Sequence, residues 1–208
     1  MNPTTDVLEQ RLAALEGGVG ALGLASGSAA ITYAIMTIAE NGDNIVSSSA
    51  LYGGTYNLFA HTFPQFGIET RMADHRKPES FEKLIDQRTK AVFCEAIGNP
   101  LGNVTDIGAL AELAHRHGVP LIVDNTVPTP YLCRPFDFGA DIVVHSTTKY
   151  LGVHDLSIGG AIVDGGTCDW ANSHRHDALF NTPDPSYHGL TYSVLGAMAF
   201  ILKARLTL

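Results

Sequence analysis

Residues 118–150 read GVPLIVDNTVPTPYLCRPFDFGADIVVHSTTKY, and they contain two short apolar runs, 119–123 and 140–144. The first run ends at Asp124, and the second ends at His145, four residues before Lys149. Short apolar runs bounded by turn residues indicate buried strands, and parallel sheets bind ligands beyond the carboxyl ends of their strands. This stretch therefore predicts one βαβ unit of a parallel sheet, with an acid and an amine at neighbouring strand ends.

The same alternation of apolar runs and helical patterns continues on both sides of this stretch. Strand-like runs fall at 20–25, 44–48, 68–72, 89–95, 119–124, 140–145 and 157–163. Helical patterns fall near 4–16, 27–39, 54–64, 78–85, 106–117 and 189–206. The alternation predicts an α/β fold with a mostly parallel seven-stranded sheet and helices on both faces. Residues 165–188, which are rich in polar residues and contain two prolines, indicate an irregular connection over the surface.

The composition bounds the classes of function. With 208 residues and 45% hydrophobic content, the chain can bury the core of one large domain. A net charge of -8 without a basic cluster argues against nucleic-acid binding. The three cysteines and nine histidines show no metal-ligand spacing, and no apolar run approaches the roughly 18 residues of a membrane span. We therefore expect a cytoplasmic protein without a metal site, a nucleic-acid partner or a membrane segment.

Asp124 and Lys149 carry the strongest chemical signal. A charge at the end of a buried strand is costly, so Asp124 requires a partner: a protonated pyridine nitrogen, an arginine or a helix N-terminus. Lys149 follows hydroxyls at Ser146, Thr147 and Thr148, two of which could reach a phosphate while the amine meets an aldehyde carbon. Pyridoxal phosphate (PLP) needs a lysine for a Schiff base and a carboxylate on its ring nitrogen. A lone lysine, by contrast, is usually a solvated surface residue.

Three further strand ends offer groups suited to the same cofactor. The small residues Ser26-Gly27-Ser28 precede a predicted helix, where backbone N–H groups and the helix dipole attract phosphate, although a compact turn also needs glycine. Tyr52 could stack on an aromatic ring or be a half-buried core residue. Asn99 could contact a ring hydroxyl or mark a plain Asn-Pro turn. A nucleotide-binding α/β domain is a weaker alternative, because the chain has neither a Gly-x-Gly-x-x-Gly nor a phosphate-loop motif.

Together these motifs resemble the Cys/Met-metabolism family of PLP enzymes, of fold type I, and within it the O-acetylhomoserine sulfhydrylase branch. The resemblance covers essentially the whole chain. Its strings are NPTT at 2–5, LYGGT at 51–55, GNP at 98–100, VDNT at 123–126 and STTKY at 146–150. The strings IGGAIVD at 158–164 and PSYHGL at 185–190 favour the sulfhydrylase branch over the cystathionine enzymes.

The resemblance implies a role for each candidate residue. Lys149 would form the internal aldimine and carry protons, and Asp124 would keep the ring nitrogen protonated. Tyr52 would stack on the ring and act in catalysis. The remaining cofactor-binding residues would be Ser26, Gly27, Ser28, Asn99, Thr126, Ser146 and Thr148. The implied reaction converts O-acetyl-L-homoserine and sulfide to L-homocysteine and acetate in a homodimer or homotetramer.

The chain departs from the family pattern in three ways. After the lysine the family usually has Gly-Gly-His-Gly, whereas this chain has Gly152-Val153-His154-Asp155, and a β-branched Val153 would be strained if that position requires a positive φ. A Tyr-x-Arg segment that reaches a neighbour's phosphate precedes residue 2 in the family. The substrate-binding arginine lies in a smaller C-terminal domain.

We therefore expect residues 1–208 to be the PLP-binding large domain, without the family's N-terminal arm and small domain. Its turnover is expected to be impaired. The alternatives are cystathionine γ-synthase, γ-lyase or methionine γ-lyase chemistry, and an inactive truncated remnant.

Overall fold

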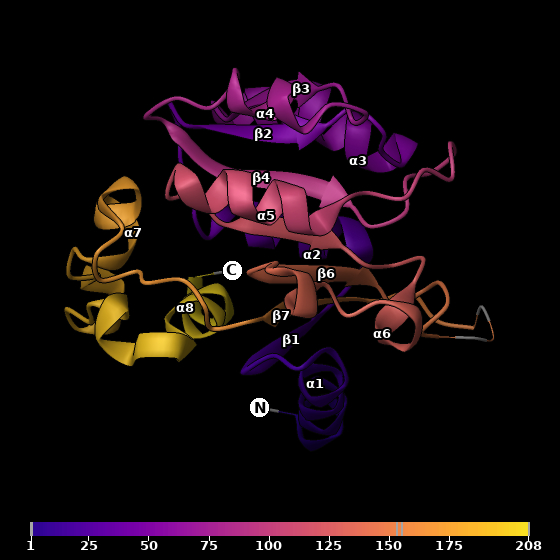
Figure 1. Ribbon diagram of the computed structural model, residues 1–208. Helices are drawn as coiled ribbons and strands as arrows, with labels where there is room; N and C mark the ends of the chain where they lie inside the picture. The colour runs from indigo at the N-terminus through magenta and orange to yellow at the C-terminus, as the bar shows by residue number, and fades with distance from the viewer. Residues whose placement is uncertain (1, 153, 155, 208) are drawn as a thin grey trace.

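A seven-stranded sheet forms the centre of the protein (Figure 1). The computed structural model describes residues 2–152, 154 and 156–207. Along the sheet the strands follow the order β1-β7-β6-β5-β4-β2-β3. Their bounds are β1 Gly20–Leu24, β2 Asn44–Ser48, β3 Glu69–Ala73, β4 Thr89–Glu95, β5 Leu121–Asp124, β6 Ile142–Ser146 and β7 Gly160–Asp164.

The sheet is mostly parallel, as the alternation in the sequence predicts. Neighbouring strands from β3 to β6 run parallel, and β7 runs antiparallel to both β1 and β6. In the register of the sheet Glu95 pairs with Asp124, and Asp124 pairs with Val144. The last residues of β4 and β5 therefore lie side by side at one edge, next to the end of β6.

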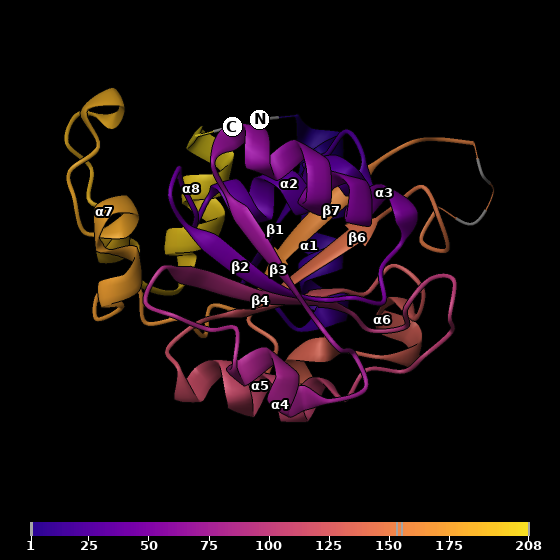
Figure 2. The same cartoon turned by 90° about the horizontal axis from the view of Figure 1, so that it is seen from above.

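Helices cover both faces of the sheet (Figure 2). The helices are α1 Pro3–Glu16, α2 Gly27–Met36, α3 Gly53–Asn57, α4 Pro78–Glu82, α5 Ile107–Arg116, α6 Thr129–Leu132, α7 Asp177–Phe180 and α8 Ala199–Thr207. One apolar core joins α2 and α8 to the sheet, and the other joins α1, α4 and α5 to its opposite face. The predicted α/β fold class is confirmed.

Local sequence signals set the ends of the long helices. The Asn2 side chain accepts a hydrogen bond from the N–H of Thr4 at 2.9 Å and caps α1, which ends at Gly17 with φ 85°. The Asp106 carboxylate accepts from the N–H of Ala109 at 3.0 Å and caps α5. Such caps satisfy backbone groups that a helix leaves unpaired. The predicted helices at 4–16 and 106–117 are confirmed within one residue at each end.

The predicted helix at 189–206 is wrong in its first half. Residues Tyr192–Met198 form 3-10 turns, and Gly196 interrupts them with φ 58° and ψ -131°, so that α8 starts only at Ala199. Glycine adopts such a backbone at low cost, which makes it an effective helix breaker. The predicted helix at 54–64 also divides, into α3, a π-helical turn at Leu58–Thr62 and a 3-10 turn at Phe63–Phe66.

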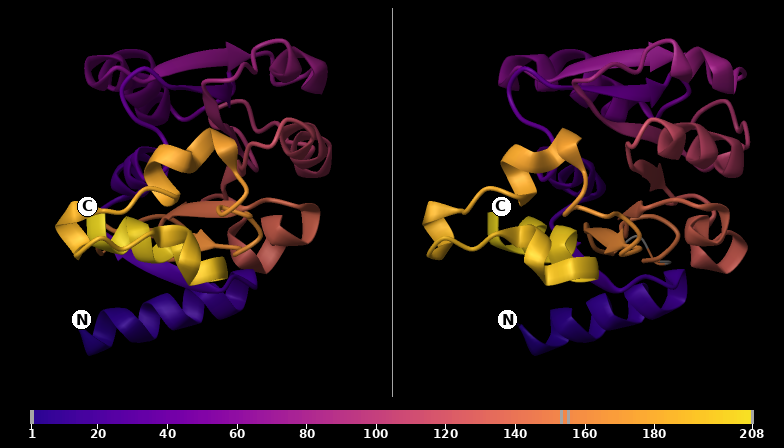
Figure 3. Two further views of the ribbon diagram at one scale, coloured as in Figure 1. Left: turned by 90° about the vertical axis from the view of Figure 1, so that its left-hand side faces the viewer. Right: turned by 60° about the vertical axis from the view of Figure 1, so that its left-hand side comes forward.

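The predicted surface connection at 165–188 is irregular, but part of it is buried. Short 3-10 turns at His174–His176 and Pro185–Tyr187 flank α7. Trp170 is 3% exposed and stacks on the fully buried Phe180, with ring centroids 4.2 Å apart. This segment gathers with α8 at the end of the sheet opposite α6 (Figures 1 and 3). Its aromatic side chains contribute to the core, which the polar composition of the segment conceals.

Candidate functional site

A cavity of about 760 Å³ lies at the carboxyl ends of the parallel strands. All ten residues predicted to bind a cofactor line it: Ser26, Gly27, Ser28, Tyr52, Asn99, Asp124, Thr126, Ser146, Thr148 and Lys149. They come from segments that are up to 123 residues apart in the chain and that meet because parallel strands end at one edge. The structure thus brings the predicted site together, while the individual binding roles stay predictions.

The start of α2 closes one side of the cavity against β6. The Ser26 hydroxyl oxygen accepts from the N–H of Ala29 at 3.1 Å and caps the helix. A Cβ atom on Gly27 would lie 2.6 Å from the Cβ atom of Ser146, so only glycine allows this approach. The first N–H groups of a helix have no partner within the helix, and they attract anions. This corner is therefore suited to a phosphate.

Asp124 is held in place by Thr126. Its Oδ1 atom accepts from the N–H of Thr126 at 2.9 Å, and the Thr126 hydroxyl oxygen accepts from the N–H of Ser146 at 2.8 Å. Burial raises the pKa of Asp124, and hydrogen bonds from Thr126 and the nearby His145 oppose that rise. Thr126 therefore joins the ends of β5 and β6 and orients the carboxylate at the cavity.

Lys149 lies in the turn after β6 and is exposed at the rim of the cavity. Its N–H donates to the carbonyl of Ser146 at 3.2 Å, which anchors the turn. The Thr148 hydroxyl accepts from the N–H of Gly159 at 3.0 Å and donates to the carbonyl of Gly159 at 3.2 Å. Thr148 thus fixes the turn to the start of β7, and its hydroxyl would have to redirect the hydrogen bond that it donates to the Gly159 carbonyl in order to donate to a phosphate. The Ser146 hydroxyl, unlike that of Thr148, makes no hydrogen bond with Gly159 among the described residues.

Glu95 is a residue of the cavity that the sequence reasoning did not single out. Its Oε1 atom accepts from the N–H of Tyr52 at 2.6 Å, and its Oε2 atom accepts from the N–H of Asn99 at 3.0 Å. Burial raises the pKa of Glu95 to about 7, and the nearby Asp124 adds to the rise. The available signal was its position, because Glu95 ends a buried strand just as Asp124 does.

A second ionisable cluster lies under the same strand ends, where α1 meets the sheet. Glu16 and His145 are both fully buried, and Oε1 of Glu16 lies 2.5 Å from Nε2 of His145. The same oxygen accepts from Nδ2 of Asn125 at 3.0 Å, and Asn125 also donates to the carbonyl of Cys133 at 2.8 Å. These contacts fix the residues next to Asp124 and Ser146, and they give Glu16 a structural role.

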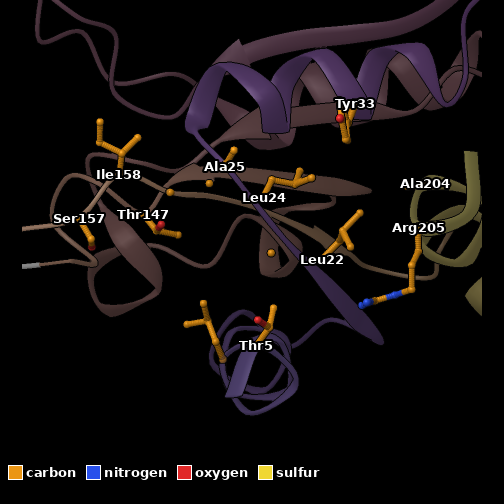
Figure 4. Close-up of a pocket in the computed structure, with 14 residues that line it drawn as sticks. Thr5, Leu22, Leu24, Ala25, Tyr33, Thr147, Ser157, Ile158, Ala204 and Arg205 are labelled. Atoms are coloured by element: carbon orange, nitrogen blue, oxygen red, sulfur yellow. The ribbon is translucent and has the colours of Figure 1, made fainter. Parts of the chain in front are cut away.

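A separate cavity of about 580 Å³ lies between α1, β1 and α8 (Figure 4). The Arg205 side chain extends from α8 toward β1, where it donates to Oε2 of Glu9 at 2.5 Å and to the carbonyl of Ala21 at 3.1 Å. None of the ten predicted residues lines this cavity. Its one charged side chain is already engaged in structural contacts.

Three further expectations concern metals, membranes and the loop after the lysine. Among the described residues there is no group of His, Cys, Asp or Glu side chains able to hold a metal ion. Within the same part of the chain, no helix is long and apolar enough to cross a membrane. Val153 and Asp155 lie outside the described residues, so the predicted strain at Val153 stays a prediction.

Comparisons with known proteins agree on one family. The family model described as Cys/Met metabolism PLP-dependent enzyme matches residues 1–198. An O-acetyl-L-homoserine sulfhydrylase of Leptospira meyeri is 52% identical over 99% of this chain and 48% of its own length. A homocysteine/cysteine synthase of Saccharomyces cerevisiae is 50% identical over 98% of this chain and 46% of its own length.

A solved structure is similar along the same residues. The putative O-acetylhomoserine (thiol)-lyase of Campylobacter jejuni, which contains a pyridoxyl-lysine phosphate, superposes with a TM-score of 0.92 at 43% identity. The match covers 99% of this chain and 52% of that protein. The chain therefore spans about half the length of the relatives it matches.

Proposed function

The chain belongs to the family of Cys/Met-metabolism PLP-dependent enzymes, and from this membership we propose that residues 1–208 are the large, cofactor-binding domain of an O-acetyl-L-homoserine sulfhydrylase. The reaction converts O-acetyl-L-homoserine and sulfide to L-homocysteine and acetate. The observation that carries the proposal is the meeting of Asp124, Lys149 and the start of α2 around one cavity. The sulfhydrylase relatives at about half sequence identity support the choice of substrate.

The residues around the cavity fit PLP. The start of α2, where Gly27 packs against Ser146, offers backbone N–H groups and a hydroxyl to the phosphate. Asp124, oriented by Thr126, offers a carboxylate to a protonated ring nitrogen. Tyr52 and Asn99 line the wall of the cavity where the face and the hydroxyl of the ring would lie. These groups match an anionic phosphate and a cationic aromatic nitrogen on a single ligand.

Lys149 is the group that we assign to chemistry. Bound PLP supplies an electron sink that makes the Cα–H bond of an attached amino acid acidic. The Lys149 amine is positioned to hold the cofactor and then to move a proton from Cα. Loss of a second proton, from Cβ, allows the Cγ–O bond of the substrate to break with release of acetate. A Cγ–S bond then forms with sulfide, and protons return to Cβ and Cα. Tyr52, which lines the same cavity, would stack on the ring.

We further propose a homodimer or homotetramer in a reducing, cytoplasmic compartment. The cysteines Cys94, Cys133 and Cys168 are free, which suits a reducing environment. Large apolar side chains that line the cavity are exposed, including Ile158 at 78% and Tyr150 at 66%, as expected of a surface that another chain covers. Sedimentation velocity on the purified chain tests the assembly, and a monomer at all concentrations would contradict it.

The test of the proposed function is an assay of the purified chain loaded with PLP. Formation of homocysteine and acetate from O-acetyl-L-homoserine and sulfide supports the sulfhydrylase. Elimination to α-keto acid and ammonia without sulfide incorporation indicates γ-lyase chemistry instead. Use of cysteine in place of sulfide indicates a cystathionine γ-synthase. Cofactor binding without any turnover indicates an inactive remnant.

A further inference from the structure

Glu95 supports an inference that rests on the proposed function and goes beyond it. We propose that Glu95 is a positioning residue that holds the Tyr52 and Asn99 segments around the cofactor ring. We propose further that Glu95 forms, with Asp124, a two-carboxylate wall that selects the ring in its nitrogen-protonated, cationic form. Glu95 acts through other residues and through its charge, so no step of bond making is assigned to it.

The first part of the proposal follows from the hydrogen bonds of Glu95. Each carboxylate oxygen accepts one backbone N–H, from Tyr52 at 2.6 Å and from Asn99 at 3.0 Å. Tyr52 directly precedes α3, and Asn99 lies in the loop after β4. One side chain thus connects the loops that follow the neighbouring strands β2 and β4. A glutamine has a single acceptor oxygen, so it can satisfy only one of these N–H groups.

The backbone of Glu95 is fixed from the other side. Its carbonyl accepts from the Thr105 hydroxyl at 2.6 Å, and the N–H of Thr105 donates to the carbonyl of Ala96 at 3.0 Å. These contacts close the loop that carries Asn99 onto the end of β4. The carboxylate therefore extends from a rigid base, and only 5% of the residue is exposed. A buried charge on a rigid strand end orients its partners with little entropic cost.

The second part of the proposal follows from the charges around Glu95. Glu95 and Asp124 are register partners at the ends of β4 and β5, and the Asp124 carboxylate adds to the rise that burial causes in the pKa of Glu95. Cys94 on β4 lies close enough for both carboxylates to raise its pKa. His145 on β6 lies near enough to oppose the rise that burial causes in the pKa of Asp124, and Lys149 lies at the cavity rim. A cationic ring between the two acids would relieve their repulsion.

The probe for this inference is pyridoxine 5'-phosphate, which has the ring and phosphate of the cofactor but no aldehyde to react with Lys149. Its binding is measured by calorimetry at pH 6 and pH 8 for the wild type and for Glu95→Gln. The control is Glu9→Gln, because Glu9 is also 5% exposed and accepts a backbone N–H, from Gly23 at 2.8 Å. Glu9 does not line this cavity, and its carboxylate is paired with Arg205. Comparison with the control cancels titration of the probe itself.

The wild type and Glu9→Gln are expected to show the same change in affinity between the two pH values. Between pH 6 and pH 8 the binding affinity of the wild type is expected to rise about tenfold more than that of Glu95→Gln. This difference corresponds to one pKa unit of linkage. The circular dichroism of the bound ring should also change in Glu95→Gln, because one of the two segments is released. A structural role alone would leave the pH profile of binding unchanged.

Several outcomes separate the inference from the proposed function. A wild type that binds no probe contradicts the proposed cofactor site itself. Binding by Glu95→Gln with the wild-type pH profile and dichroism overturns the inference and leaves the site intact. If Glu95→Gln is unfolded by far-ultraviolet dichroism, Glu95→Asp decides, because it keeps the charge and shortens the reach. A retained pH profile with altered ring dichroism in Glu95→Asp supports the inference, and a lost pH profile overturns it.

Discussion

The parallel strands form an amino-end edge and a carboxyl-end edge of the sheet, and acidic side chains have different partners at the two. At the amino ends of the strands, Asp86 contacts Arg71 at 2.8 Å and accepts from Nδ2 of Asn44 at 2.9 Å. At the carboxyl ends, Glu95 and Asp124 lie beside each other and accept hydrogen bonds from uncharged backbone N–H groups. The pKa of Asp86 is held well below its usual range, whereas the pKa values of Glu95 and Asp124 are raised.

This difference indicates that acidic side chains at the amino ends stabilise the fold, whereas Glu95 and Asp124 at the carboxyl ends lack a salt-bridge partner among the described residues. Near Asp86, Arg175 donates to the carbonyls of Asp86 at 2.6 Å and His117 at 3.0 Å, so these hydrogen bonds connect residues 165–188 to the sheet. Paired and hydrogen-bonded charges of this kind stabilise the native state. Two neighbouring buried carboxylates destabilise it, and such costs concentrate at functional sites. The carboxyl-end edge is therefore the one prepared to bind a cation.

The largest expected effect at the carboxyl-end edge comes from Lys149→Ala. We expect sulfhydrylase turnover to fall by about 1000-fold or more, because the role proposed for the amine is to hold the cofactor and move the proton. The exposed side chain contributes little to folding, so the thermal midpoint of the apo-protein should not change. Lys83→Ala, at another exposed lysine, is the control for turnover. Equal activity in both variants would remove Lys149 from the chemistry.

The next effect separates structural from functional acids at the same edge. Glu16→Ala leaves His145 and Asn125 buried without their carboxylate partner, which should lower the free energy of unfolding by about 3–5 kcal/mol. Urea unfolding of the apo-protein measures the loss. If Glu16→Ala kept full stability and lost only cofactor affinity, the Glu16–His145 pair would belong to the binding site and not to the scaffold.

The pH dependence of stability should carry the signature of Glu95. Its pKa is raised from 4.5 to about 7, so the folded state binds more protons than the unfolded state between these values, and stability falls as pH rises through that window. Because one pKa unit corresponds to about 1.4 kcal/mol, the contribution of Glu95 to this change in the free energy of unfolding is about 3 kcal/mol. Subtracting the urea profile of Glu95→Gln isolates this share, because Asp164, whose pKa is also raised to about 7, is present in both proteins. A flat difference would contradict the assignment.

Paired substitutions at the two edges give the most direct contrast. Asp86→Asn should lower the free energy of unfolding by about 1–3 kcal/mol without changing cofactor affinity, because it weakens charge-assisted hydrogen bonds. Asp124→Asn should weaken cofactor binding by about 10- to 100-fold, which corresponds to a loss of about 1–3 kcal/mol of binding free energy. It should leave the free energy of unfolding unchanged or raise it. Calorimetry with PLP and urea unfolding are run on both proteins. The opposite pattern would exchange the roles of the two edges.

Periodic and local signals in the sequence were sufficient for the sheet and for much of the site. Apolar runs ending at Asp124 and His145 predicted strands β5 and β6, and the parallel topology then brought distant strand ends to one cavity. The helix near 27–39 and the small residues before it were predicted from the sequence, and the structure adds that Ser26 caps α2 and that Gly27 lies close to Ser146.

The features that were missed depend on contacts between distant residues. Glu95 lies 43 positions from Tyr52, and Glu16 lies 129 positions from His145, so neither pairing leaves a local pattern. Gly196 breaks the last helix although the apolar spacing continues through it. Trp170 is buried because Phe180 and Phe200 stack around it, which the polar composition of residues 165–188 does not indicate.

The location of the covalent cofactor adduct shows directly whether Lys149 and the carboxyl-end edge hold PLP. The chain is incubated with PLP, reduced with borohydride and digested, and the modified peptide is identified by mass spectrometry. We expect one stoichiometric adduct, on Lys149 at the carboxyl-end edge, which disappears when excess pyridoxine 5'-phosphate occupies the cavity. Adducts spread over Lys77, Lys83 and Lys90, or a single adduct at the amino-end edge, would contradict it.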